Sequence, residues 1–271
     1  AFLMSRRTSP GKFMLMALVI NDRTGISDTF GFYNVSLDEL TKLIVKFYKS
    51  EGKYKVSPAY IKYRTECAAE KTIEKKRKFP YEFICWKPML ADIRKLPLSP
   101  EQINEKTDLN PNIKEDDVFV VLTKNFTFRW YIMPEDNSLI KTVFDEFYTS
   151  NGDDISVLND LLKKYVNEIF DENTTNLWKD RLNNLVYLLN ESGKTEQASL
   201  FLYILKNSDM FMTFKYILLQ RSITNYAVSL AESNKQTFIN IFKKKNSEQN
   251  KYDSKKLNLI LQTIKEQWTD E

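Results

Sequence analysis

Lysine, arginine and tyrosine side chains are interleaved between residues 42 and 78 of this 271-residue chain. Segment 41–80 holds twelve Lys and Arg against four Glu, a net charge of +8, whereas the whole chain carries only +4. Cations of this kind neutralise phosphates and release counterions, and tyrosine rings offer stacking surfaces for bases. The residues that would contact RNA or DNA are Lys46, Lys49, Lys53, Lys55, Lys62, Arg64, Lys75, Lys76, Arg77 and Lys78. In the competing interpretation, the lysines keep a helix soluble and the tyrosines pack into the core.

The chain contains no histidine. Ser-His-Asp catalysis, Cys-His catalysis and His-ligated zinc are therefore excluded within it. Carboxylates alone could hold Mg²⁺ or Ca²⁺, and the acidic candidates are Asp22 with Asp28, Asp116 with Asp117, and Asp153 with Asp154. None of these has the alternating ligands of a calcium loop, and roles in turns and helix caps explain them. We predict no catalytic residue, metal or cofactor, and keep a carboxylate-metal-dependent enzyme as an alternative.

Gly193-Lys194-Thr195 matches the last three residues of the phosphate-binding P-loop pattern. The full pattern needs another glycine five residues earlier, where this chain has Leu188, and a strand before the loop. Residues 178–189 instead have a helical pattern. We therefore interpret Gly193 as the stop of one helix, followed at once by the start of the next.

The two cysteines, Cys67 and Cys85, are too few for a disulfide framework and are not spaced as a metal-binding pair. They favour a reducing compartment, and we expect a cytoplasmic protein. The longest apolar run, residues 13–20, is about half of the ~18–20 residues that span a bilayer. We therefore expect a buried strand there and no transmembrane segment.

Local patterns predict the elements that must position the basic residues. Residues 13–20 and 26–35 flank a polar turn and predict a hairpin of two strands. Ser36 and Glu39 have the spacing of a capping box, so a helix should begin after Ser36 and end near Gly52. Ser57 followed by Pro58 predicts a second helix, which should stop before Pro80. The basic residues would then lie on these two helices and the segment between them.

Later segments complete the predicted sheet. A short helix is expected over 81–86 and an irregular connection over 95–117, which holds three prolines. Residues 117–122 and 126–133 look like two more strands around a polar turn. With the first hairpin they would form a small mixed or antiparallel sheet.

Residues from 138 onward lack proline, and apolar residues recur there three and four apart. This spacing predicts helices over 155–169, 174–191, 195–207, 212–232 and 254–268. Short loops between them favour an all-helical bundle or an irregular helical stack. We predict an α+β fold, with an α+β domain over 1–135 and a helical domain over 136–271.

The helical half is rich in Phe, Leu and Tyr and has no convergent set of polar groups. Stacked helices of this kind commonly present a protein-binding surface. We therefore predict a non-catalytic protein-interaction or scaffold protein whose partner is another protein. An RNA- or DNA-associated protein that binds through the 42–78 surface is the first alternative.

Overall fold

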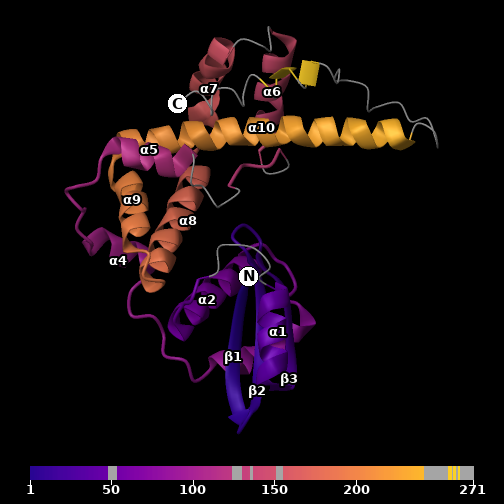
Figure 1. Ribbon diagram of the computed structural model, residues 1–271, viewed down its shortest axis with the longest axis vertical. Coiled ribbons are helices and arrows are strands. Elements are labelled where there is room, and N and C mark those ends of the chain that lie inside the picture. Colours follow the sequence, from indigo (N-terminus) through magenta and orange to yellow (C-terminus); the bar gives the residue numbers. More distant parts are fainter. Residues whose placement is uncertain are drawn as a thin grey trace. The chain divides into compact units, whose positions relative to one another are not determined.

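The computed structural model describes residues 1–47, 54–123, 130–134, 137–150, 155–240, 256–257, 259–260 and 262 (Figure 1). Within these ranges a three-stranded antiparallel sheet comes first and ten α-helices follow, so the predicted α+β fold class is confirmed. The chain forms two compact units. Unit 1 comprises residues 1–109 and 180–199, and unit 2 comprises residues 110–179 and 200–271. The division into an α+β domain over 1–135 and a helical domain over 136–271 stays a prediction.

The sheet of unit 1 has the strand order β1-β2-β3. Strands β2 (Lys12–Asn21) and β3 (Gly25–Ser36) form the predicted hairpin. Strand β1 (Phe2–Ser9) was not predicted. Its second half, from Ser5 onward, is exposed and polar because β1 is an edge strand, so its sequence lacks the alternation by which strands are recognised.

Helices cover both faces of this sheet, and this explains the unbroken apolar run in β2. Met16 and Leu18 point to one face, where they pack against Ile61 and Ala68 of one helix and the short helices beyond it. Leu15 points to the other face and packs with Leu40. A strand buried on both faces needs apolar residues at every position rather than at every second one.

Helix α1 (Leu37–Phe47) begins at the predicted capping box. The Ser36 hydroxyl accepts a hydrogen bond from the Glu39 amide (3.3 Å), and the Glu39 carboxylate accepts one from the Ser36 amide (2.8 Å). The predicted end of this helix at Gly52 lies outside the described residues.

Three helical segments lie on the opposite face of the sheet from α1: α2 (Pro58–Glu74), α3 (Tyr81–Trp86) and the 3₁₀ helix η1 (Lys87–Leu90). The predicted cap of α2 is confirmed, since the Ser57 hydroxyl accepts a hydrogen bond from the Tyr60 amide at 3.3 Å. Trp86 packs directly over Gly31 of β3, where any Cβ would overlap its ring. The missing side chain therefore lets α3 approach the sheet closely.

Unit 1 also contains α4 (Pro100–Lys106), which lies within the segment that we expected to be irregular. The Ser99 hydroxyl accepts a hydrogen bond from the Gln102 amide (3.2 Å), and the Gln102 side chain accepts one from the Ser99 amide (3.0 Å). This is a full capping box. Pro100 occupies the first turn, where the missing N–H costs nothing, so the proline density of this segment was misleading.

Unit 2 is built from helices. They are α5 (Glu115–Thr123), α6 (Leu139–Thr149), α7 (Ile155–Ile169), the first part of α8 (Glu172–Glu191), the second part of α9 (Thr195–Lys206) and α10 (Ser208–Asn240). The predicted helices over 155–232 are thereby confirmed. Of the predicted helix over 254–268, residues 256–257, 259–260 and 262 are helical and the others lie outside the described part.

The predicted strand over 117–122 is wrong, because these residues belong to helix α5. Their Val and Phe content favoured a strand, but burial follows a helical period. Val118 and Leu122 are fully buried, whereas Phe119 and Val120 are each 39% exposed. Acidic residues in the first turn stabilise the helix N-terminus. At the other end, Arg221 donates a hydrogen bond to the Leu122 carbonyl (2.6 Å).

The second predicted strand, over 126–133, is described only from residue 130 onward, and residues 130–133 form no strand. The Ile132 amide donates its hydrogen bond to the Ser222 hydroxyl on α10 at 2.8 Å, so a side chain takes the place of a neighbouring strand. Within the described residues, no helix is both long and apolar enough to cross a membrane.

Candidate functional site

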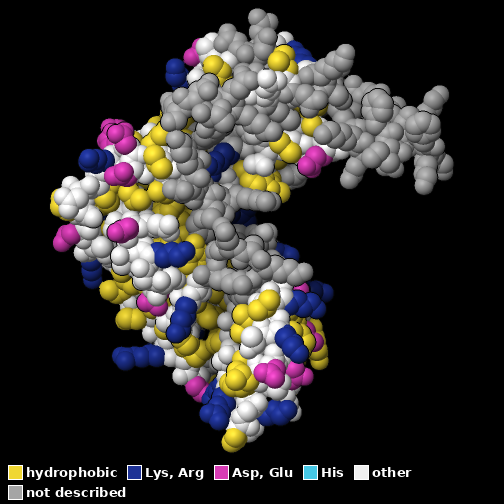
Figure 2. Space-filling view, viewed as in Figure 1, with side chains coloured by type: hydrophobic (Ala, Val, Ile, Leu, Met, Phe, Trp, Pro, Cys, Tyr) yellow, Lys and Arg dark blue, Asp and Glu magenta, His cyan; other side chains and the backbone are white. Residues whose placement is uncertain are grey.

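The structure describes eight of the ten predicted basic residues, all of them in unit 1. Lys49 and Lys53 lie outside the described residues. Lys55 precedes α2 and Lys75 follows it, so about 25 Å of helix separates them. On the face drawn in Figure 2, Lys and Arg side chains are interrupted by apolar and acidic ones. Six of the ten predicted residues are exposed: Lys46, Lys55, Lys75, Lys76, Arg77 and Lys78.

Arg64 points into unit 1 rather than to solvent. Its Nη2 atom lies 2.6 Å from Asp22 Oδ1 and its Nη1 atom lies 3.6 Å from Asp180 Oδ2. Arg181 reaches the second oxygen of Asp22 at 3.2 Å. Burial raises the pKa of Asp180, an effect that the nearby Arg64 opposes. The Arg64 guanidinium is therefore occupied by two carboxylates and only 13% exposed.

Lys62 is also held within unit 1. Its ammonium group donates hydrogen bonds to the backbone carbonyls of Ile93 (2.8 Å) and Ala91 (3.4 Å). These bonds tie α2 to the segment that follows η1. Like Arg64, Lys62 supports the structure of unit 1 instead of presenting a free charge.

Residues 75–78, which we name the basic turn, form the densest group of predicted cations. Lys75 lies 3.2 Å from Glu74, and Arg77 donates a hydrogen bond to the Thr24 carbonyl (3.2 Å). Lys76 has a backbone φ of 51°, in the left-handed region that ends a helix. Among the described residues, Lys76 and Lys78 have no ion-pair partner.

The other candidates for chemistry have structural roles. Asp28 accepts a hydrogen bond from the Thr29 amide at 2.8 Å, and Asp116 and Asp117 lie in the first turn of α5. Asp153 and Asp154 lie outside the described part. Among the residues that the structure describes, no three Cys, Asp or Glu side chains lie close enough together to hold a metal ion. Gly193, with φ 75°, lies between α8 and α9, as the helix-stop interpretation predicted.

Cys67 does not resemble an activated thiol. Cys67 is half-buried, and burial raises its pKa, whereas a nucleophilic cysteine needs a lowered one. Cys85 is exposed, and both thiols are free. Cys67 is therefore best explained as an ordinary side chain of α2.

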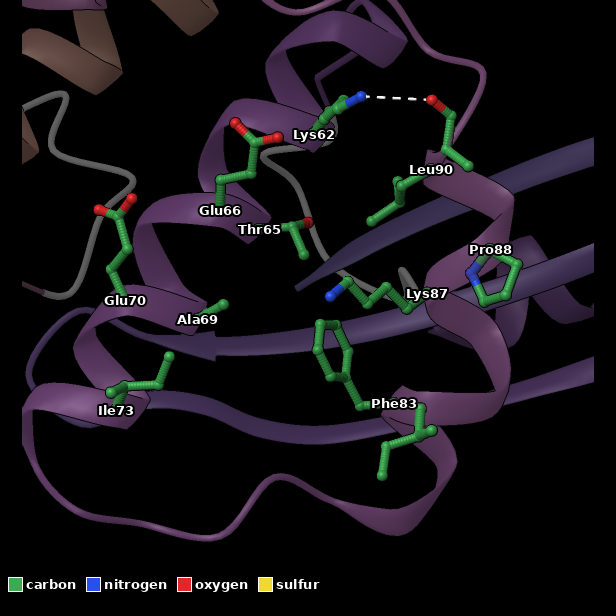
Figure 3. Close-up of a pocket in the computed structure, with 12 residues that line it drawn as sticks. Lys62, Thr65, Glu66, Ala69, Glu70, Ile73, Phe83, Lys87, Pro88 and Leu90 are labelled. Atoms are coloured by element: carbon green, nitrogen blue, oxygen red, sulfur yellow. Dashed lines mark hydrogen bonds between the residues drawn. The ribbon is translucent and has the colours of Figure 1, made fainter.

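Unit 1 contains a pocket that the sequence did not reveal. Helix α2 forms one wall, and α3 with η1 forms the other (Figure 3). Thr65 and Ala69 point into this space from α2, and Phe83, Lys87 and Leu90 point into it from the opposite wall (Figure 3). Its volume is about 620 Å³. We name it the α2–α3 groove, and its lining residues are Lys62, Thr65, Glu66, Ala69, Glu70, Ile73, Phe83, Ile84, Lys87, Pro88, Leu90 and Ala91.

Two large apolar side chains that line the α2–α3 groove remain mostly in water. Ile73 on α2 is 65% exposed and Ile84 on α3 is 66% exposed. Both line the groove, and Tyr81 on α3, one turn before Ile84, is 79% exposed. Phe83 and Leu90, deeper in the groove, are buried against the sheet. The groove thus has an apolar floor and an apolar rim.

Both walls carry charged side chains, and the α2 wall includes the cation Lys62, whose ammonium bonds to backbone carbonyls. Glu66 and Glu70 lie one turn apart on the α2 wall, and Lys87 extends from the η1 wall (Figure 3). Glu66 pairs with Lys95 at 3.4 Å on the exposed surface. Within the described residues, Glu70 and Lys87 form no ion pair. Each wall therefore offers one uncompensated charge at the edge of an apolar surface.

The sequence shows the residues of this groove but not their arrangement. The Glu66-Glu70-Glu74 spacing indicates a solvated helix face. This pattern describes α2 considered by itself and does not show which helix lies beside it. Only the packing of α2 and α3 on the same sheet face brings Ile73 and Ile84 into the lining of one groove. An isoleucine at an exposed helical position is the local sign that could have been followed.

Comparison of the chain with protein-family models, curated proteins and solved structures finds no match.

Proposed function

We propose that this chain is a non-catalytic protein-interaction protein and that its partner binds in the α2–α3 groove. The observation that carries the proposal is the exposed apolar rim around a groove with an apolar floor. Contiguous exposed apolar surface rimmed by charge is typical of binding sites, whereas single exposed apolar residues are ordinary. The free thiols of Cys67 and Cys85 further favour a reducing compartment, and we infer the cytoplasm.

The rim residues have little to do with folding, which supports a role in binding. Ile73 and Ile84 each leave about two thirds of their surface in water. Their contribution to the hydrophobic core is correspondingly small, because apolar stabilisation follows the area removed from water. A partner that covers them would gain this area, and apolar anchors at the centre of an interface commonly dominate its energy.

The test compares two charge substitutions at equally exposed apolar residues. Ile84→Asp lies in the groove, and Val45→Asp lies on α1, where Val45 is 59% exposed. Proteins captured from the native extract by the full chain are identified, purified and titrated against both variants. We expect Ile84→Asp to raise the Kd of the true partner about tenfold or more and Val45→Asp to leave it unchanged. Equal effects of the two substitutions would contradict the proposal.

Nucleic-acid binding is the second candidate function, and the exposed basic turn favours it. Binding that is driven by counterion release should weaken steeply with salt. The Kd for a panel of single- and double-stranded oligonucleotides, measured at two salt concentrations, checks this. Neutralising Lys76 and Lys78 should remove the binding, and Lys141→Ala on α6 is the control at an exposed lysine outside the 42–78 surface. Salt-independent affinity would exclude this function.

A further inference from the structure

We infer that the occupant of the α2–α3 groove is an amphipathic α-helix of about three turns, with a basic edge against α2 and an acidic edge against η1. This inference rests on the proposed function and adds the chemistry of the partner. It follows from the length of the groove, from the elements that line it and from the charges on its walls.

The α2 wall sets the length of the occupant. The lining residues on this helix run from Lys62 to Ile73. Eleven helical steps span about 16 Å, which matches about three turns of a second helix lying alongside. A partner helix of that length presents apolar anchors at positions i, i+3 or i+4, and i+7. These anchors would cover the surface between Ile73 and Ile84.

The lining elements favour a helix over an extended peptide. Every lining residue belongs to α2, α3 or η1 or follows η1 directly, and none belongs to a strand. Helical walls satisfy their own backbone groups, so the groove itself offers no sheet edge for strand addition. The carbonyls of Ala91 and Ile93 already accept hydrogen bonds from Lys62. An extended peptide would therefore bury unpaired N–H and C=O groups, whereas a helix pairs its own.

The charges on the walls set the edges of the occupant. Glu70 on α2 would face Lys or Arg on one side of the partner helix, and Lys87 would face Asp or Glu on the other, whereas Glu66 is already paired with Lys95. Glu70 and Lys87 have no ion-pair partner among the described residues, so a docking helix would supply one to each. Such edge charges fix the register and suppress wrong partners more than they add affinity.

The experiment selects binders to the full chain from a phage-displayed library of random peptides of about 16 residues, long enough for a three-turn helix of about 11 residues and its flanks. We expect enriched peptides with helical apolar periodicity and a Lys or Arg flanking the apolar stripe. Synthetic copies should show helical circular dichroism when bound, and Ile84→Asp should raise their Kd about tenfold. When the Glu70→Lys variant is the target of the selection, the enriched peptides should carry Asp or Glu at the same flanking position. Val45→Asp is the matched control and should leave the Kd unchanged.

Different results would separate the inference from the proposed function. Peptides that lose affinity with Ile84→Asp but lack helical periodicity would overturn the helix and leave the groove as a binding site. Helical peptides whose flanking charge is unaffected by Glu70→Lys would overturn the assignment of the edges. An absence of peptides that depend on Ile84 would overturn the inference, and the purified partner would then test the groove independently.

Discussion

Arg64 connects two carboxylates that are far apart in the chain, Asp22 in the turn after β2 and Asp180 on α8. Like charges so close together need the cation between them, because a half-buried site screens their repulsion poorly. Arg64 therefore acts as a structural residue, although its position in a basic stretch suggested contact with phosphates. The residue type was evident from the sequence, but its ion partners depend on tertiary packing.

Arg64→Met should destabilise the protein by about 2 kcal/mol, since it leaves Asp22 and Asp180 without their shared cation but keeps an unbranched apolar stem. Urea unfolding measures this change. The control is Arg6→Met, because the pair of Arg6 with Asp92 is exposed on both sides (54% and 76%) and should cost less than about 0.5 kcal/mol. Equal losses in the two variants would refute the structural role of Arg64.

Glu146 on α6 should make stability depend on pH. Tyr165 donates a hydrogen bond to its carboxylate and Lys164 lies 3.1 Å away, and together they lower the Glu146 pKa below 4.5. A lowered folded-state pKa stabilises the protein above the unfolded value, and this contribution is lost as pH falls through the folded value. The advantage of wild type over Glu146→Gln in urea midpoint should therefore shrink below about pH 4.5.

The same titration with Tyr165→Phe identifies the cause of the shift. The hydrogen bond from Tyr165 is the largest contribution to the lowered Glu146 pKa, so its loss should weaken the pH dependence more than Lys164→Met does. A wild-type advantage that stays constant from pH 7 to pH 3 would show that the Glu146 pKa is not lowered in the folded protein.

At the scale of elements, the close packing of α3 on β3 depends on a glycine. Gly31→Ala should cost about 2 kcal/mol, because the new Cβ would overlap the Trp86 ring and force α3 away from the sheet. Gly193→Ala is the control. Gly193 has φ 75° and open space around it, so its cost of about 1 kcal/mol would come from the backbone alone. Thermal unfolding measures both losses of stability. A smaller loss in Gly31→Ala than in Gly193→Ala would contradict the close packing of α3 on β3.

The apolar rim of the α2–α3 groove should be dispensable for folding. Ile84→Asp should change the free energy of unfolding by less than about 0.5 kcal/mol, since Ile84 is 66% exposed. The neighbouring Phe83, only 4% exposed, provides the contrast, and Phe83→Ala should cost about 3 kcal/mol. Urea unfolding decides both values. A large loss in Ile84→Asp would mean that Ile84 serves the core rather than a partner.

Elements with strong local patterns could be predicted from the sequence. The β2–β3 hairpin, the cap of α1 and the start of α2 each follow from a few neighbouring residues. Helix α5 could not be predicted, because its Val and Phe residues favour a strand locally and its burial pattern depends on contacts with α10. Edge strand β1 was missed for the opposite reason, since it has no apolar alternation to detect.

At the scale of the whole molecule, distant segments combine in ways that no local pattern shows. Residues 180–199 belong to unit 1, where the Tyr60 hydroxyl donates a hydrogen bond to Asn184 (2.9 Å) and the two rings of Tyr60 and Tyr187 stack at 4.7 Å. The groove arises in the same way, from helices whose adjacency is fixed by the sheet beneath them. Its residues could be read from the sequence, but their juxtaposition could not.

Site-specific photo-crosslinking tests the central claim most directly. Benzoylphenylalanine is placed at position 84 in the groove or at position 45 on α1, and the full chain is irradiated in the native extract. We predict that position 84 crosslinks one identified protein through a helical segment and that position 45, of similar exposure, does not. If the two positions crosslinked the same proteins equally, or only position 45 did, the α2–α3 groove would not be the docking site.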